Sequence, residues 1–265
     1  MPEIISSRKN TTVRHAAKLA SSAEHRRREG LFMLEGARLC RDAAESGVPV
    51  QTLFYTEQAE QKYALYLEPV AAAAHQVYLI EPHVAELLSE TKNTQGIFCV
   101  CGMREALTAS SGMTADRQYL ALENVQDPGN LGAVLRTAEA LGIGGVLLAG
   151  SCCDVYSPKV LRASMGAVFR LPFFFADSMA EVVEQLQKQG LKIYAAVPDH
   201  AAADITQTRF SLGSVVVVGN EGNGLEPATI QACGASVTIP MKGRAESLNA
   251  ASSSAILMWE LMRCI

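Results

Sequence analysis

Three polar segments contain residue types that could bind a ligand and assist a group transfer. They are NVQDPGN (residues 124–130) with Arg136 six positions later, GNEGNGL (residues 219–225) and IPMKGRAESLNA (residues 239–250). Each follows an apolar run, and together they supply three carboxylates, several carboxamides, a hydroxyl and two guanidinium groups. Their glycines permit close approach of the backbone to a ligand. This chemistry suits the positioning of a polar substrate and the handling of a departing proton.

Taken singly, each segment also has a purely structural interpretation. Asn130 could be a helix N-cap after a turn at Pro128 and Gly129, and Ser247 or Asn249 could cap the last helix. The first loop has neither common glycine spacing of a phosphate-binding loop. Capping does not explain Arg136, a cation in the N-terminal half of a helix. Three such loops at successive strand ends therefore favour one shared site.

The elements that position these loops alternate between strands and helices. Strands are expected at residues 120–123, 145–149, 192–197, 214–218 and 236–239, and helices at residues 130–142, 157–166, 178–190 and 246–262. Continuous β-branched runs such as residues 215–218 are typical of central parallel strands covered on both faces. The pattern predicts a doubly wound α/β domain over residues 119–265, with its site at the carboxyl ends of the strands.

A smaller α/β domain is predicted over residues 1–105. It comprises a helical arm near residues 11–28, helices at 36–46, 57–74 and 82–89, and strands at 52–55, 77–80 and 97–100. Residues 106–118 are small and polar and are predicted to be a linker.

Composition excludes several classes of protein. The chain has 265 residues, of which 49% are hydrophobic and 19% charged, which is typical of a globular protein with a substantial core. It has no apolar run long enough to span a membrane and no apolar signal core near residue 1, so we expect a cytoplasmic protein. The seven cysteines form no Cys-x-x-Cys pair and the five histidines give no paired ligands, so we expect no metal site and inert, buried thiols.

Charge is distributed unevenly along the chain. Residues 1–41 carry nine basic and four acidic side chains, whereas the rest of the chain has a formal charge of −9. A basic arm on an acidic body suits attraction to a phosphate backbone, although a solvated helix face would look the same.

The three segments resemble, in order, motifs one, two and three of the SpoU/TrmH family of RNA ribose 2′-O-methyltransferases, within the SPOUT superfamily. The likeness covers residues 119–265, and residues 157–167 resemble the helix between the family's motifs. Residues 1–105 resemble, more loosely, the family's N-terminal substrate-binding domain, which has a ribosomal-protein-like RNA-binding fold. The elements that match there are residues 32–36 and 94–96.

The resemblance implies a deep trefoil knot in the C-terminal domain, a homodimer formed through that domain, and S-adenosylmethionine as cofactor. Cofactor contacts are expected at Gly219, Asn220, Gly224, Ile239, Met241 and Leu248. The implied catalytic residues are Arg136, Asn130, Glu221, Ser247 and Asn249.

Among these, Arg136 matches the family's proposed catalytic residue. Because a guanidinium stays protonated, we expect Arg136 to clamp a phosphate or oxyanion and to assist proton removal, and its role as a true base stays open. Asn130 is expected to position the ribose or Arg136, and Glu221 to orient Arg136 or its neighbours.

RNA, most of all ribosomal RNA, is the expected substrate. Its 2′-hydroxyl is a group that DNA lacks. The expected RNA-binding side chains are Arg26, Arg27, Arg28, Lys92 and Arg162. Open alternatives are a transfer-RNA methyltransferase and a non-catalytic RNA-binding or assembly factor on the same fold. A dinucleotide-dependent oxidoreductase is disfavoured by the absence of a Gly-x-Gly-x-x-Gly loop.

Overall fold

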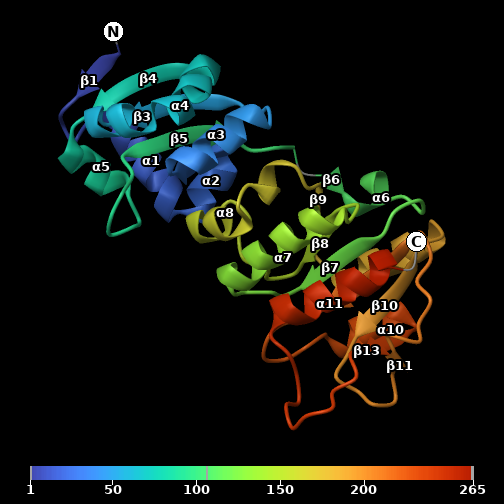
Figure 1. The fold of residues 1–265 in the computed structure, drawn as a ribbon. Helices are drawn as coiled ribbons and strands as arrows, with labels where there is room; N and C mark the ends of the chain where they lie inside the picture. The colour runs from blue at the N-terminus through green and yellow to red at the C-terminus, as the bar shows by residue number, and fades with distance from the viewer. Residues whose placement is uncertain (1, 106, 264–265) are drawn as a thin grey trace. The chain divides into compact units, whose positions relative to one another are not determined.

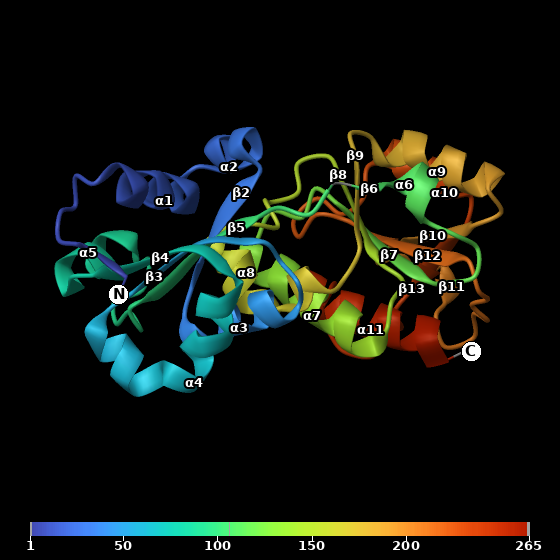
Figure 2. The same ribbon diagram turned by 90° about the horizontal axis from the view of Figure 1, so that it is seen from above.

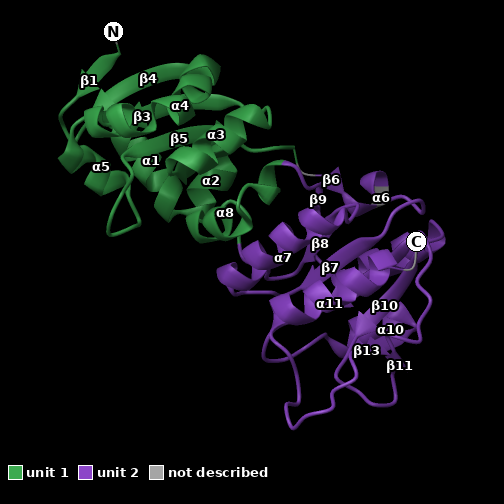
Figure 3. Ribbon diagram, in the orientation of Figure 1, with its two compact units in different colours: residues 1–105, 154–169 green, residues 106–153, 170–265 purple. Residues whose placement is uncertain are grey.

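The computed structural model describes residues 2–105 and 107–263 and divides the chain into two compact units (Figures 1 and 3). Unit 1 comprises residues 1–105 and 154–169, and unit 2 comprises residues 106–153 and 170–265. Within the described residues, no helix is long and apolar enough to cross a membrane.

Unit 1 is built on a mixed five-stranded sheet. Its strands lie in the order β1 (Glu3–Ile5), β4 (Ala74–Ile80), β3 (Val50–Tyr55), β5 (Ile97–Gly102) and β2 (Leu31–Glu35). β1 and β3 pair parallel to β4, whereas β5 pairs antiparallel to β3 and β2. The helices of this unit are α1 (Thr11–Ser21), α2 (Ala23–Glu29), α3 (Ala37–Glu45), α4 (Glu57–Ala73), α5 (Pro82–Leu88) and α8 (Pro158–Ser164).

Residues 154–169 belong to unit 1, although the sequence places them in the C-terminal domain. Aromatic packing explains this assignment, because the ring of Phe32 on β2 lies 4.8 Å from that of Tyr156 and 6.4 Å from that of Phe169. Arg104 adds two hydrogen bonds, from its backbone N–H to the Tyr156 hydroxyl and from its guanidinium to the Phe169 carbonyl.

Arg26 is buried in unit 1, which corrects its prediction as an RNA-binding residue. Its side chain is 5% exposed and pairs with Asp154 at 2.7 Å. The same guanidinium donates to the carbonyls of Leu19 and Ala20, at 2.6 and 2.9 Å. Arg26 therefore joins α1 and α2 to the segment that begins at Asp154, and four of its five N–H donors are used within unit 1.

We expect Arg26→Ala to lower the free energy of unfolding by about 3–5 kcal/mol, because it leaves the Asp154 carboxylate in place without its partner. The exposed neighbour Arg27 is the control, and Arg27→Ala should change this free energy by less than about 0.5 kcal/mol. Urea unfolding followed by circular dichroism measures both. Equal midpoints for the two variants would contradict the structural role.

Unit 2 is built on an eight-stranded sheet in which every strand pair is parallel. The order is β11 (Ala203–Asp204), β13 (Ser236–Thr238), β10 (Lys192–Ala196), β12 (Ser214–Val218), β7 (Tyr119–Glu123), β8 (Val146–Ala149), β9 (Phe173–Ala176) and β6 (Leu107–Thr108). β7 and β12 lie side by side at the centre and are fully buried. The predicted α/β fold with a parallel sheet is confirmed.

Helices cover both faces of this sheet (Figure 2). One face carries α6 (Ala109–Gly112), α9 (Met179–Lys188) and α10 (Pro227–Cys233), and the other carries α7 (Pro128–Leu141) and α11 (Ala250–Arg263). β6 and α6 lie within the predicted linker. β6 adds an edge strand to the sheet of unit 2, and Ala109 of α6 and Met113, which follows α6, join its core. Residue 106 of that linker lies outside the described residues.

The thiols of unit 1 are shielded from solvent. Cys40, Cys99 and Cys101 are fully buried, and burial raises the pKa of the Cys99 and Cys101 thiols. Cys152 and Cys153 are half-buried, and Cys264 lies outside the described residues. Within the described residues, no cluster of three or more His, Cys, Asp and Glu side chains could hold a metal ion.

Candidate functional site

A glycine loop at residues 219–225 forms one wall of the candidate site at the carboxyl end of β12. Asn220 and Gly224 exchange two backbone hydrogen bonds, at 2.9 and 3.0 Å, and close the loop. The Asn220 side-chain oxygen accepts from the backbone N–H groups of Gly222 and Asn223. A Cβ on Gly219 would lie 2.2 Å from the Gly224 carbonyl carbon, so only glycine fits there.

A chain of hydrogen bonds joins the three segments that the sequence singled out. The Asn130 amide donates to Glu221 Oε1 at 3.0 Å, and the Asn249 amide donates to Asn130 Oδ1 at 2.9 Å. These contacts connect residues up to 119 positions apart in the sequence. Asn130 uses both a donor and an acceptor in this chain, whereas Asn249 donates within it and accepts from the first backbone N–H groups of the last helix, so the orientation of both carboxamides is fixed.

The two helices beside this chain begin with side-chain caps. Asp127, and not Asn130, is the N-cap of α7, and its carboxylate accepts from the Asn130 backbone N–H at 2.7 Å. The Asn130 side chain is thereby free to reach Glu221. Asn249 caps α11 by accepting from the backbone N–H groups of Ala251 and Ser252, so this helix begins at Ala250 and not at residue 246.

Glu221 is held as a carboxylate. Burial acts to raise its pKa, but hydrogen bonds from the Asn130 amide and from the backbone N–H groups of Asp127 and Gln126 outweigh burial and lower the pKa. A carboxylate with a lowered pKa is a poor proton acceptor near neutral pH. Its geometry instead suits an acceptor that fixes Asn130.

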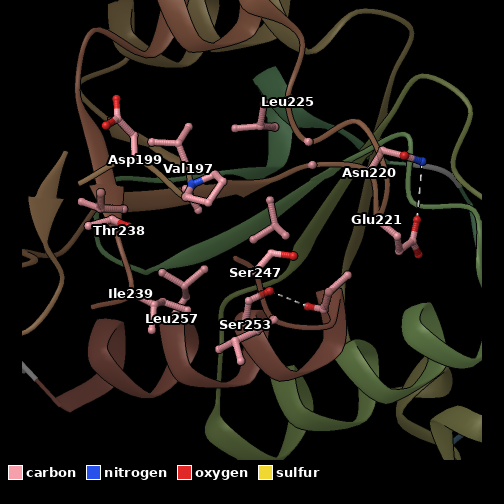
Figure 4. A pocket seen from close by; sticks show the side chains of 18 of the residues that line it. Val197, Asp199, Asn220, Glu221, Leu225, Thr238, Ile239, Ser247, Ser253 and Leu257 are labelled. Carbon is pink, nitrogen blue, oxygen red and sulfur yellow. Dashed lines mark hydrogen bonds between the residues drawn. The ribbon is translucent and has the colours of Figure 1, made fainter. Parts of the chain in front are cut away.

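A cavity of about 570 Å³ lies between the glycine loop and residues 239–250. All six predicted cofactor contacts line it, as do Glu221 and Ser247, whereas Asn130 and Asn249 do not. Figure 4 shows Leu225 on one side of the cavity, Ile239 and Leu257 on the other, and Asn220 and Glu221 at one end. The cavity thus combines apolar walls with a polar end, as expected of a small-molecule site.

Arg136 lies on the exposed side of α7, six residues beyond Asn130. Leu131, Val134 and Leu135 anchor the helix in the core. Within the described part of the chain, the Arg136 guanidinium has no hydrogen-bond or ion-pair partner, and Arg136 does not line the cavity. A guanidinium in this state is available to a substrate.

The remaining predicted RNA contacts lie in unit 1. Arg27, Arg28 and Lys92 are exposed, although Arg28 also contacts His25 and Glu29. Arg162 is half-buried and pairs with Glu90 at 3.3 Å, while its buried Nη1 finds no partner among the described residues. The loop that carries Lys92 is held by Glu35, which accepts hydrogen bonds from Ser89 and Thr91.

Asn124 is a site residue that sequence reasoning did not single out. It adopts a left-handed backbone conformation, with a φ of 56°, directly after β7. Its side chain accepts from the Ser151 backbone N–H at 2.7 Å and donates to Glu226 at 3.0 Å, and its carbonyl accepts from the Asn220 amide at 2.8 Å. The sequence signal that could have identified Asn124 is an asparagine directly after an apolar strand, because asparagine tolerates a left-handed backbone conformation.

Comparison with known protein families shows which family this chain matches. Residues 117–259 match the model of the SpoU rRNA Methylase family, which is more than half of the chain. The chain belongs to this family. Residues 10–99 match an MRM3-like substrate binding domain. The family predicted from the three motifs is therefore confirmed.

Relatives within the family match over nearly the whole chain. The chain is 31% identical to the 23S rRNA (guanosine(2553)-2′-O)-methyltransferase RlmP of Bacillus subtilis, over 97% of this chain and 98% of that protein. It is 30% identical to a 23S rRNA (uridine(2479)-2′-O)-methyltransferase of Streptomyces viridochromogenes, over 92% and 87%. An AdoMet-bound rRNA methyltransferase from Sinorhizobium meliloti has a TM-score of 0.84 at 30% identity, over 98% and 97% of the two chains.

Proposed function

We propose that this protein methylates a ribose 2′-hydroxyl of ribosomal RNA, with S-adenosylmethionine as the methyl donor. The observation that carries this proposal is the hydrogen-bonded chain Glu221–Asn130–Asn249 beside the 570 Å³ cavity. Family membership and relatives named as rRNA 2′-O-methyltransferases support the reaction, and AdoMet-bound neighbours support the cofactor.

The residues of the cavity fit such a cofactor. Leu225, Ile239 and Leu257 offer apolar contacts to a flat base, and Gly219 lines the cavity without a side chain that would fill it. Asn220 and Ser247 offer polar contacts. When bound, the cofactor supplies an activated methyl group on a sulfonium, so the protein has mainly to align the acceptor and manage one proton.

Arg136 and Asn130 have the chemistry to act on the acceptor. The Asn130 carboxamide, fixed by Glu221 and Asn249, positions the ribose. Arg136 places a permanent positive charge where the 2′-oxygen becomes negative, which stabilises the oxyanion as its proton departs. Glu221 acts through Asn130 and is a positioning residue.

Methyl transfer from tritiated S-adenosylmethionine tests the function. The acceptors are ribosomal RNA and transfer RNA from cells that lack this protein, followed by mapping of ribose methylation. We expect label in ribosomal RNA at a 2′-hydroxyl. Label in transfer RNA alone would show that the substrate is transfer RNA and not ribosomal RNA. The absence of label in any RNA would support a non-catalytic RNA-binding factor.

Replacement of Gly219 by alanine tests the cofactor cavity. The added Cβ meets the Gly224 backbone, and the glycine loop has to shift to accommodate it. We expect about tenfold weaker binding of S-adenosylmethionine, measured by calorimetry, because such overpacking typically costs about 1–3 kcal/mol. Gly102→Ala is the control, since Gly102 lies on β5 in unit 1 and a Cβ there makes only ordinary contacts, with Pro49 at 3.5 Å. Unchanged affinity in Gly219→Ala would place the cofactor elsewhere.

RNA binding by unit 1 is part of the same proposal. Arg27, Arg28 and Lys92 are exposed and basic, and residues 10–99 match a substrate-binding domain, for which we infer a ribosomal-protein-like fold. Charge reversal of Arg27 and Arg28 should weaken RNA binding and reduce its salt dependence, measured by filter binding at several salt concentrations. If the variant bound RNA with the affinity and salt dependence of the wild-type protein, Arg27 and Arg28 would form only a solvated helix face.

We extend the proposal to a homodimer formed through α11. Ile256 and Trp259 on this helix are 38% and 58% exposed, and large apolar side chains of this kind commonly mark an interface. Sedimentation should give a dimer mass that Trp259→Asp converts to a monomer. A monomeric wild-type protein would refute the dimer.

A trefoil knot in unit 2 completes the proposal. It is supported by the return of α11 to pack on α7 and β12 after the chain has formed β13 farther along the sheet. Stretching a single denatured molecule by its ends tests the knot. A knotted chain should stop short of its full contour length, whereas an unknotted chain should reach it.

A further inference from the structure

A second cavity, of about 480 Å³, lies in unit 2 at the carboxyl ends of β7, β8 and β12. It shares residues 220 and 223–225 of the glycine loop with the first cavity. Gln126, Ser151, Glu226 and Pro227 line only the second cavity. We propose that it binds the nucleobase of the nucleotide whose ribose is methylated, an inference that rests on the proposed function.

The frame of this cavity is held rigidly by Asn124. Its side chain and carbonyl connect Ser151 after β8, Glu226 before α10 and Asn220 after β12. Beneath it, the buried Glu123 carboxylate accepts from the Glu226 backbone N–H and from the Thr229 hydroxyl. Asn124 keeps a positive φ to make these contacts. Strained backbone of this kind persists where the surroundings over-determine it, often at binding sites.

The hydrogen-bonding groups that face this cavity suit a neutral heterocycle. The Gln126 carboxamide and the Ser151 hydroxyl have no hydrogen-bond partner among the described residues and offer both donors and acceptors. Among the residues that the structure describes, no Lys, Arg or His lines the cavity, and Glu226 adds a carboxylate, which disfavours a phosphate. Leu225 and Pro227 provide apolar surface for the face of a ring. Bases taken out of a stack are recognised by such a combination of edge hydrogen bonds and apolar contact.

The position of the cavity fits the geometry of a nucleotide. The base and the 2′-oxygen are attached to adjacent ribose carbons, so a base pocket must adjoin the cavity of the methyl donor. The shared glycine loop provides this proximity. The Gln126 backbone N–H also donates to Glu221, which in turn holds Asn130. The residue that contacts the base is thereby tied to the residue that positions the ribose.

Nucleoside binding to the full-length protein tests the proposal. S-adenosylhomocysteine at saturating concentration fills the first cavity, and adenosine, guanosine, cytidine, uridine and ribose 5-phosphate are then compared by saturation-transfer NMR. We expect at least one nucleoside to bind with a Kd on the order of 1 mM, and ribose 5-phosphate to bind more weakly. The double variant Gln126→Ala, Ser151→Ala should lose about tenfold in nucleoside affinity, because it removes two hydrogen-bonding groups.

The matched control is Gln185→Ala, an exposed glutamine of α9 that lines neither cavity. It should bind nucleosides like the wild-type protein, and S-adenosylhomocysteine affinity should be equal in all variants. With RNA as acceptor, the double variant should raise KM about tenfold or change which base is methylated. The base pocket is refuted if no nucleoside binds better than ribose 5-phosphate, or if the double variant binds nucleosides as the wild type does. Methyl transfer by the wild-type protein tests the reaction independently, so the pocket can fail while the proposed function stands.

Discussion

Replacement of Arg136 by alanine is expected to lower the rate of methyl transfer by about 10²–10³-fold, with little change in stability or in cofactor affinity. A loss of this size in rate is typical when one group that stabilises a developing oxyanion is removed. Stability should hold because Arg136 is exposed and has no described partner, and cofactor affinity should hold because it does not line the cofactor cavity. Single-turnover methylation measures the rate, and calorimetry measures the affinity.

Two further variants make the Arg136 experiment specific. Arg209→Ala removes an exposed arginine of unit 2 that lines neither cavity, and it should retain full activity. Arg136→Lys keeps the charge but loses the planar fork of donors, so an intermediate rate supports an electrostatic clamp. If Arg136→Ala kept the wild-type rate, the catalytic assignment of this residue would be wrong.

Glu221→Gln is expected to lower the rate about 100-fold. The carboxylate accepts from the Asn130 amide and from two backbone N–H groups, and a carboxamide would present an N–H₂ donor to at least one of these donors. Hydrogen bonds to a charged group are worth about 1.5–3 kcal/mol each, which corresponds to roughly 10–150-fold in rate. Single-turnover methylation again provides the measurement.

A double-mutant cycle separates positioning from direct chemistry. If Glu221 acts through Asn130, the double variant Glu221→Gln, Asn130→Ala should be no slower than Asn130→Ala alone. Losses that simply multiply would show that Glu221 contacts the substrate on its own account. Either single variant should keep a wild-type circular dichroism spectrum.

The pH dependence follows from the lowered pKa of Glu221. Because the folded-state pKa lies below the ordinary value of 4.5, the carboxylate's contribution is complete above that value and is lost only as pH falls through the lower folded value. Wild-type activity should therefore show no ionisation from Glu221 between about pH 5 and pH 8. An acid limb near pH 6 that disappears in Glu221→Gln would contradict this assignment.

The local sequence pattern was sufficient to predict most helices and strands and the loops that form the site. The β-branched run at residues 215–218 predicted the central strand β12, and polar loops after strands predicted convergence at one edge, which the chain Glu221–Asn130–Asn249 confirms. These features depend on interactions that repeat within a few residues or on the general geometry of parallel sheets.

Other features depend on contacts that a local pattern does not contain. β2 was not predicted because antiparallel pairing with β5 defines it, and Arg26 was assigned to RNA because its partner Asp154 lies 128 residues away. The short helix α10 was also missed, and its first residues depend on contacts to the buried Glu123. Long-range pairing decided each case.

The assignment of residues 154–169 to unit 1 has a consequence for how such enzymes change their targets. The polypeptide passes from one unit to the other after residues 105, 153 and 169. A gene fusion that exchanged only the first 105 codons would separate Arg26 from its native Asp154 and Phe32 from its native aromatic neighbours. New specificity in this architecture is therefore expected to arise by point substitution within an interleaved chain, because recombination at a single crossover would break its core.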